Sequence, residues 1–252
     1  MNDMGYKSPG ELYYGSDVGT VISAIDDLII EKMKEKSIDF TQEYFPILLR
    51  KETLSKTGYL KRGNKDCIYV YNPDIKNPNI EYVLTPSACF HIYEKYEHFN
   101  FDKEKVFTLK QHVFRDEIND EWRDEIRLRD YQIREIVFFG SKSYVEIIRT
   151  KLIDVAESVM EELNIPYSIK LSTDSFVHPI MKRYQQVQIE KKSKYELIIK
   201  YFGKEVAVAS FNLHDRAFTG PFDINVNQIK TYSGCVGFGL ERIALCYLKE
   251  RV

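Results

Sequence analysis

The chain has 252 residues, of which 44% are hydrophobic and 29% charged, proportions typical of a globular enzyme that buries a sizeable core. Its formal net charge of −2 disfavours tRNA or DNA as the main partner, because proteins that wrap nucleic acid carry a basic surplus. No run of 18 apolar residues occurs and the polar N-terminus is no signal peptide, so we expect no membrane segment and a cytoplasmic location.

The first half of the chain combines one long helix with several strands. Apolar residues keep helical spacing over 16–36, and Ser16 is the expected N-cap. An extended stretch follows at 45–49, and a Pro/Asn-rich turn divides residues 65–84 into two strands. Two more strands are expected, one on each side of the polar segment 118–130, at 106–117 and 134–140.

The second half begins with a helix expected at 143–163, where Ser143 and Glu146 have the spacing of a capping box and Pro166 follows the end. The remaining elements are two strands, a glycine-rich turn and a C-terminal helix, at 195–202, 205–212, 234–239 and 240–248. Because strands cluster instead of alternating strictly with helices, the pattern predicts a single α+β domain over 1–252, with an antiparallel sheet flanked by helices.

The sequence contains four widely spaced cysteines and no CxxC pair. In a reducing compartment this spacing argues against a disulfide framework and leaves metal binding, catalysis or core packing. Cys67 lies in an expected strand and Cys246 on the apolar face of the last expected helix, so core packing is predicted for both. Cys89 and Cys235 instead stand inside chemically distinctive motifs.

The first motif is formed by two strands and the loop between them, with Phe-Arg-Asp-Glu at 114–117 and Arg-Asp-Tyr-Gln-Ile-Arg-Glu at 129–135. Such strands can bind a nucleotide: the Arg115 guanidinium contacts the α-phosphate, the Glu117 carboxylate accepts from the adenine amino group, and the Tyr131 ring stacks on the base. Arg129 is a further candidate ATP-binding residue. Taken alone, the pattern is more often a charged hairpin with solvated ion pairs.

The second motif reads Gly-Cys-Val-Gly-Phe-Gly-Leu-Glu-Arg at 234–242. Glycine lets the backbone approach a ligand closely at a helix start, and Arg242 there can meet a terminal phosphate. The neighbouring Glu241 either orients Arg242 or adds a surface charge. Alone, the motif is a weak signal, since a plain glycine-rich helix entry looks the same and the Lys-Ser/Thr of a P-loop is missing.

The distance along the chain from Arg115 in the first motif to Arg242 in the second is 127 residues. In this order the two motifs resemble motifs 2 and 3 of class II aminoacyl-tRNA synthetases. The expected helix 16–36 and the strand with Pro46 that follows it are similar to motif 1, the dimer-forming element of that family. The resemblance covers nearly the whole chain. It implies an antiparallel sheet, a bent ATP molecule and a homodimer.

Four stretches resemble a narrower family, the amino acid:[carrier protein] ligases: TPSACF (85–90), YQIREIVFFGS (131–141), ASFNLHDRAF (209–218) and SGCVGFGLERI (233–243). Those ligases are homologues of atypical zinc-dependent seryl-tRNA synthetases and lack a tRNA-binding domain. The resemblance implies that ATP adenylates a small amino acid, which then passes to the phosphopantetheine thiol of an acyl or peptidyl carrier protein. It also implies Cys89, Glu135 and Cys235 as ligands of a zinc ion.

The chemistry of these three residues is compatible with that role. Two thiolates and a carboxylate are zinc ligands, and a three-ligand set leaves a fourth position for an unprotonated α-amine, which directs the amino-acid carboxylate toward the α-phosphate. Asn212 and His214 are candidates to line the amino-acid pocket, and polar residues at a strand end are the alternative. The histidines at 91, 98, 112 and 178 receive no role.

Two segments depart from the family pattern. Related synthetases place an acidic metal-binding residue before motif 3, where this chain has Val208-Ala209-Ser210, so the resemblance assigns no residue to the magnesium ion that bridges the phosphates. The segment 173–185 matches only loosely and leaves the amino acid unidentified. A basic stretch nearby is one candidate docking surface for an acidic carrier protein, a solvated helix face being the alternative: Lys182, Arg183, Lys191, Lys192 and Lys194.

We therefore predict a two-step, adenylate-forming ligase with Arg115 and Arg242 as catalytic residues, on the α- and γ-phosphates. One alternative is an aminoacyl-tRNA synthetase, which the mild acidity and the missing tRNA-binding extension disfavour. The other is a catalytically silent paralogue that binds an amino acid or adenylate. Intact Arg115, Glu117 and Arg242 argue against the silent paralogue, and the missing acidic residue near Ala209 argues for it.

Overall fold

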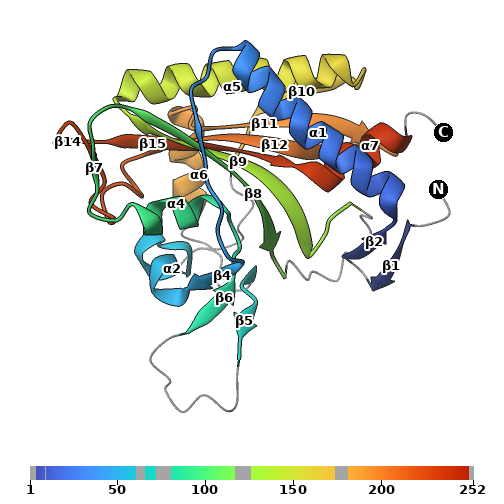
Figure 1. The fold of residues 1–252 in the computed structure, drawn as a ribbon, viewed down its shortest axis with the longest axis horizontal. Coiled ribbons are helices and arrows are strands. Elements are labelled where there is room, and N and C mark those ends of the chain that lie inside the picture. Colours follow the sequence, from blue (N-terminus) through green and yellow to red (C-terminus); the bar gives the residue numbers. More distant parts are fainter. Residues whose placement is uncertain are drawn as a thin grey trace.

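A seven-stranded sheet forms the centre of the chain in a computed structural model, which describes residues 4–8, 10–60, 66–71, 81–116, 126–173 and 181–249 (Figure 1). All neighbouring strands are antiparallel except the edge pair β3–β8. The predicted α+β architecture with an antiparallel sheet is therefore confirmed. The strand order is β10 (Tyr167–Leu171), β11 (Lys194–Tyr201), β12 (Lys204–Asp215), β15 (Tyr232–Gly239), β9 (Asp130–Gly140), β8 (Lys105–Phe114) and β3 (Thr41–Gln42).

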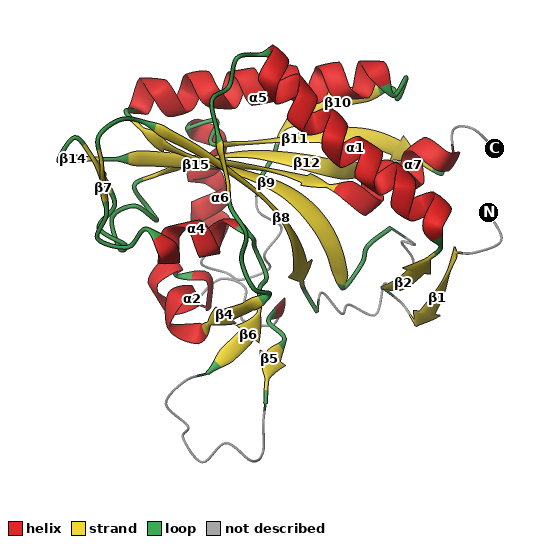
Figure 2. Ribbon diagram, in the orientation of Figure 1, coloured by secondary structure: helices red, strands yellow, loops and turns green. Residues whose placement is uncertain are grey.

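Three amphipathic helices cover one face of this sheet: α1 (Ser16–Glu35), α5 (Lys142–Glu162) and α7 (Leu240–Lys249) (Figure 2). Their apolar residues join the sheet in one core, in which Ile29, Leu152 and Ile243 are fully buried. Helical spacing of apolar residues predicts such packing, because it places them on a single stripe of the helix. None of the helices in the described ranges is long and apolar enough to cross a membrane.

The opposite face carries smaller elements and a second core, in which Leu54, Ile92 and Phe139 are buried. Two short helices lie here, α2 (Lys51–Thr57) and α4 (Cys89–Lys95), beside a three-stranded sheet in the order β4 (Leu48–Arg50), β6 (Tyr82–Leu84) and β5 (Tyr69–Val70). The other elements are the hairpin β1 (Met4–Ser8) and β2 (Glu11–Tyr14), helix α6 (Met181–Glu190), and the strands β7 (Asn100–Phe101), β13 (Asn225–Val226) and β14 (Ile229–Lys230).

Strand β9 contributes to both cores, because successive side chains of a strand point to opposite faces. Ile136 and Phe138 belong to the core under α1 and α5. Ile133 and Val137 belong to the core beside α4. Glu135 therefore faces the side of the sheet on which Cys89 lies.

The helix caps differ from those expected. Gly15, not Ser16, is the N-cap of α1 and has extended backbone angles, so Ser16 is already helical. Ser141, not Ser143, caps α5, and its hydroxyl accepts a hydrogen bond from the backbone N–H of Tyr144. The sequence offered two serines two residues apart, and only the one with extended backbone can accept from the third residue of the helix.

The glycine-rich segment at 234–239 is a strand and not a turn, which corrects the sequence-based prediction. It forms most of β15, between β12 and β9. A Cβ on Gly234 would lie 2.3 Å from the ring of Phe138, and one on Gly237 would lie 2.8 Å from a carboxylate oxygen of Glu135. These glycines therefore make room for neighbouring side chains within the sheet.

Cys67 and Cys246 are both buried apolar residues, as predicted. Cys246 lies in α7 and belongs to the core under α1 and α5. Cys67 belongs to the other core, although it precedes β5 instead of lying within a strand. Burial raises the pKa of the Cys67 thiol to about 11, so this sulfur stays protonated and unreactive at neutral pH.

Candidate active site

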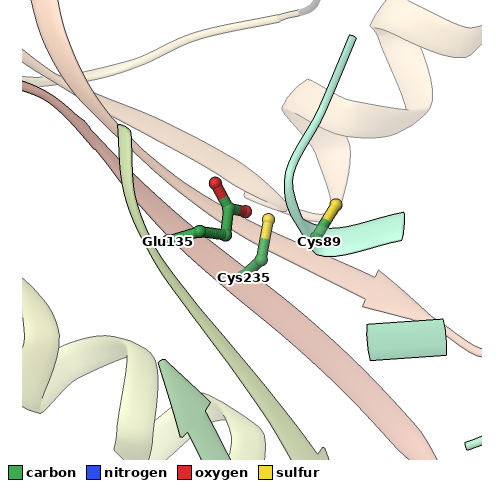
Figure 3. Close-up of side chains that lie close together, drawn as sticks. All are labelled: Cys89, Glu135 and Cys235. Carbon is green, nitrogen blue, oxygen red and sulfur yellow. The ribbon is translucent and has the colours of Figure 1, made fainter. Parts of the chain in front are cut away.

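Three buried side chains converge beside the second core: Cys89, Glu135 and Cys235. One ligand atom from each lies within 4.8 Å of the other two. Figure 3 shows that Glu135 and Cys235 project to the same side of adjacent strands, with Cys89 opposite them at the start of α4. The structure thus brings together the three predicted metal ligands from segments that are far apart in the sequence.

The antiparallel register of β9 and β15 explains this arrangement. Glu135 pairs with Gly237, and Val137 pairs with Cys235. Since paired residues of an antiparallel sheet share a face, Glu135 and Cys235 are diagonal neighbours on one face. Gly237 leaves the space that the Glu135 carboxylate occupies.

The electrostatics of this cluster favour a bound cation. Burial raises the pKa of Glu135 to about 7, against the opposing effects of a hydrogen bond with Cys235 and the charge of Arg115. A hydrogen bond with Cys89 raises the pKa of Cys235, and burial and the negative charge of Glu135 add to it. Burial, followed by the charges of Cys89 and Cys235, also raises the pKa of Tyr93. A divalent cation relieves both the desolvation and the mutual repulsion, and two thiolates with a carboxylate fit zinc.

Polar side chains surround the two sulfurs. The Ser87 hydroxyl lies 3.2 Å from the Cys89 sulfur. His214 Nε2 lies 3.3 Å from the Cys235 sulfur, and Asn212 Nδ2 lies 3.8 Å from the same atom. The structure therefore places Asn212 and His214, predicted as pocket residues, directly beside a candidate metal ligand.

Arg115 links the first motif to the segment that carries Cys89. Its Nε donates to the carbonyl oxygen of Pro86 at 2.8 Å. Its backbone N–H donates to the carbonyl oxygen of Arg129 at 2.7 Å, which joins the two arms of the motif. A phosphate bound by Arg115 would consequently lie beside the three candidate ligands.

The other predicted nucleotide-binding residues gather near the same end of β9. Arg129 lies 3.5 Å from Asp116 and 3.8 Å from Glu11. The Arg242 guanidinium lies 5.9 Å from the centre of the Tyr131 ring, within the range of a cation–π contact. Glu117 lies outside the described residues.

Arg242 is held by backbone groups on two sides. Its Nε donates to the carbonyl oxygen of Ile126 and its Nη1 to that of Ala207, both at 3.0 Å. These contacts fix the guanidinium between β12 and the segment around Ile126, which leads into the second strand of the first motif. The second sequence motif is thereby attached to the first.

Glu241 is neither a surface charge nor a direct partner of Arg242 in the described contacts. It is 3% exposed, and its carboxylate accepts from the backbone N–H of Gln132 at 2.8 Å. The Gln132 side chain and the Tyr14 hydroxyl donate to the other oxygen, at 3.3 and 3.4 Å. Glu241 therefore ties α7 to β9 and to the N-terminal hairpin.

Sequence reasoning missed Ser87 and Tyr93, which lie around the candidate ligands. Ser87 precedes Cys89 by two residues, and Tyr93 follows it by one helical turn. The helical spacing from Cys89 to Tyr93 is a signal in retrospect. However, α4 has only seven residues and its helical pattern is too short to be recognised from sequence.

Comparison with known proteins identifies a family. The sequence profile of the tRNA synthetase class II core domain (G, H, P, S and T) matches residues 71–251. The type-2 serine–tRNA ligase of Methanocaldococcus jannaschii is 26% identical over 281 residues, which cover 97% of this chain and 53% of the relative. An amino acid–[acyl-carrier-protein] ligase of Bradyrhizobium diazoefficiens is 26% identical over 226 residues, which cover 80% of this chain and 68% of the relative.

A solved structure of similar fold is the seryl-tRNA synthetase of M. kandleri in complex with A. aeolicus tRNASec. The match has a TM-score of 0.81 at 20% sequence identity and covers 97% of this chain and 54% of the other. The chain thus spans about half the length of the serine–tRNA ligases that it matches.

Proposed function

Because the chain belongs to the tRNA synthetase class II core domain family, we propose that it activates a small amino acid with ATP and passes it to the phosphopantetheine thiol of a carrier protein. The observation that carries this proposal is the cluster of Cys89, Glu135 and Cys235 beside Arg115. In this proposal the cluster binds the amino group of the amino acid, and Arg115 beside it binds the α-phosphate. The named activity of the Bradyrhizobium relative supports the carrier protein as acceptor.

In the first step, a carboxylate oxygen of the amino acid attacks the α-phosphorus of ATP, the bond to the bridging oxygen breaks, and pyrophosphate leaves. Arg115 holds the α-phosphate and stabilises the charge that develops there, while Arg242 holds the γ-phosphate. Tyr131, Arg129 and Glu117 bind the rest of the nucleotide. A bound magnesium ion would neutralise charge on the phosphates, and none of residues 208–210 is acidic to hold it.

In the second step, the thiol of the carrier's prosthetic arm attacks the activated carbonyl, and AMP leaves with its electron pair. Cys89, Glu135 and Cys235 would hold a zinc ion, which when bound would act as a Lewis acid for the unprotonated α-amine of the substrate. The chain supplies the orientation: β9 and α4 fix the amine site, and Arg115 fixes the phosphate. Positioning of this kind accounts for much of the rate enhancement in such reactions.

Amino-acid-dependent exchange of labelled pyrophosphate into ATP tests the first step. We expect exchange with one or a few small amino acids among the twenty, and its loss after zinc chelation and return on adding zinc. Arg115→Ala is expected to lower exchange by roughly 100-fold or more. No exchange in zinc-loaded protein would instead favour a silent paralogue that binds an amino acid or adenylate.

The acceptor is tested separately, with the same activated amino acid. We expect loading of a holo-carrier protein and none of the apo-carrier, which lacks the thiol. Seryl-tRNA synthetase activity is the second candidate, favoured by the names of the relatives that cover 97% of this chain. Serine-dependent exchange together with charging of tRNA, without carrier loading, would establish that alternative.

Docking of an acidic carrier on the basic stretch rests on charge complementarity. Lys191 forms an ion pair with Asp215, and Lys194 one with Glu196, so part of this charge is neutralised within the chain. Lys192 is exposed, and the side chains of Lys182 and Arg183 lie outside the described residues. Replacing Lys182, Lys191 and Lys192 by Glu is expected to impair carrier loading but not pyrophosphate exchange; unchanged loading would exclude this surface.

A homodimer and a cytoplasmic location complete the proposal. The exposed apolar residues Tyr44, Ile47 and Leu48 follow α1 in the region similar to motif 1 and are suited to a subunit interface. None of the four cysteines, all of which lie in the described ranges, forms a disulfide bond, which suits a reducing compartment. Sedimentation velocity of the wild type and of Ile47→Asp tests the dimer: a monomeric wild type would exclude it.

A further inference from the structure

The imidazole of His214 lies against one candidate ligand, and we propose that His214 is a positioning residue that donates a hydrogen bond to the Cys235 thiolate. His214 Nε2 is 3.3 Å from the Cys235 sulfur. The ring packs on Phe218, with 4.6 Å between ring centroids, so its direction is constrained. The inference rests on the proposed metal centre and adds a hydrogen-bond donor to one of its ligands.

The direction of this hydrogen bond follows from the chemistry of the sulfur. A metal-bound thiolate only accepts hydrogen bonds, so Nε2 of His214 carries the proton. Asn212 Nδ2 approaches the same sulfur at 3.8 Å, a longer and weaker contact. Both residues come from β12, where Asn212 pairs directly with Cys235.

His214 acts through Cys235 and is not itself a ligand. Among the described residues, Cys89, Glu135 and Cys235 form the one group of three or more whose ligand atoms all lie within 4.8 Å of one another, and His214 is not part of it. The fourth position therefore stays open for a substrate amine. An N–H donor on a buried thiolate stabilises its negative charge and fixes the direction of its lone pairs, and partners of this kind typically contribute 10- to 100-fold to metal affinity.

The test compares two substitutions of similar size, His214→Gln and His214→Met. Glutamine keeps an N–H donor near the position of Nε2, whereas methionine removes it. Zinc affinity is measured by competition with a chromophoric chelator, and the thiolate-to-metal charge-transfer band is recorded after cobalt substitution. His112→Phe, which alters an imidazole on the half-exposed side of β8, is the matched control.

We expect His214→Met to weaken zinc binding by about 10-fold or more and to shift the cobalt band to longer wavelength, because the thiolate loses its donor. His214→Gln should retain affinity within about threefold of the wild type, as should His112→Phe. If methionine prevents folding, His214→Phe, which keeps a ring against Phe218, replaces it.

Equal affinity and an unshifted band in His214→Met or His214→Phe would overturn the role of His214 while leaving the metal centre intact. Equal losses in the Gln and Met variants would also overturn it, since they indicate a packing role. A wild-type protein that binds neither zinc nor cobalt would overturn the metal centre itself and this inference with it.

Discussion

At the scale of single residues, burial decides the chemistry of Glu241. The carboxyl group is surrounded by Gln132 and Tyr14, and burial raises its pKa from 4.5 to about 7 despite the hydrogen bonds that it accepts. Its sequence neighbour Arg242 contacts different groups altogether. Two adjacent residues at the start of α7 therefore have different roles: Glu241 attaches the helix to its neighbours, and Arg242 is proposed to bind ATP.

The raised pKa of Glu241 predicts a dependence of stability on pH. Between about pH 4.5 and 7 the folded protein keeps a proton that the unfolded chain releases, so the free energy of unfolding falls as pH rises through this range, by at most roughly 3 kcal/mol. Glu241→Gln removes this contribution. We expect the variant to show a shallower decline than the wild type in urea unfolding across this range.

The exposed carboxyl group of Glu31 on α1 provides the control. Glu31→Gln should reproduce the wild-type decline. A Glu241→Gln variant with the same decline as the wild type would show that Glu241 has no such proton in the folded state.

At the scale of elements, the glycines of β15 determine where Glu135 lies. A Cβ on Gly237 would come within 2.8 Å of the Glu135 carboxylate and 2.7 Å of Ile133. We expect Gly237→Ala to displace Glu135 and to weaken zinc binding by about 10-fold or more. Gly239→Ala is the control, because its nearest contact would be 3.5 Å, an ordinary van der Waals distance.

Equilibrium dialysis against zinc, with folding checked by circular dichroism, measures both glycine variants. If Gly237→Ala bound zinc as tightly as Gly239→Ala, the close packing of Glu135 against β15 would not control the metal site.

A buried ion pair joins α1 to β9. Arg134 Nε and Nη2 donate to the two carboxylate oxygens of Asp26, at 2.7 and 2.8 Å, and both residues are almost completely buried. Lys110 lies 3.5 Å from the same carboxylate. Arg134 thus attaches α1 to one face of β9, and Glu135 contributes to the candidate metal site on the opposite face.

Removing Asp26 leaves the Arg134 charge buried without its partner. Asp26→Ala is therefore expected to lower the free energy of unfolding by about 3–5 kcal/mol, measured by urea denaturation. Asp27→Ala, at the exposed neighbouring position, should change it by less than about 1 kcal/mol. Similar losses in both variants would indicate a general effect on α1 instead of the ion pair.

At the scale of the whole molecule, two cores lie on opposite faces of one sheet, and the candidate metal site borders the core beside α4. The site joins three segments that are separate in sequence, at Cys89, Glu135 and Cys235. A metal ion bound there would therefore connect α4 to the sheet. Its binding energy would add to the stability of the fold, because the unfolded chain does not keep these ligands together.

Zinc in 100-fold excess over its dissociation constant is expected to stabilise the folded chain by about 2.7 kcal/mol and to raise Tm by roughly 5 °C or more, measured by calorimetry against chelator-treated protein. Cys235→Ser should lose most of this shift because it removes a thiolate ligand. A wild-type Tm that is the same with zinc and with chelator would contradict a metal centre at this site.

The sequence by itself determined the class of fold and the long elements. The apolar period of 16–36 and 143–163 identified α1 and α5 within a few residues, since burial of one stripe of a long helix leaves a repeated pattern. The order of motifs indicated the class II synthetase family, which the family profile confirms. The sequence also singled out residues 89, 135 and 235, through their motifs.

Only the tertiary structure decided how these residues meet. The register of β9 and β15 sets Glu135 and Cys235 on one face, and a shift of one residue would separate them. The glycines of β15 suggested a turn because local propensity does not include the side chains of the adjacent strand. The position of His214 on Cys235 and the burial of Glu241 likewise depend on contacts between distant segments, which no local pattern encodes.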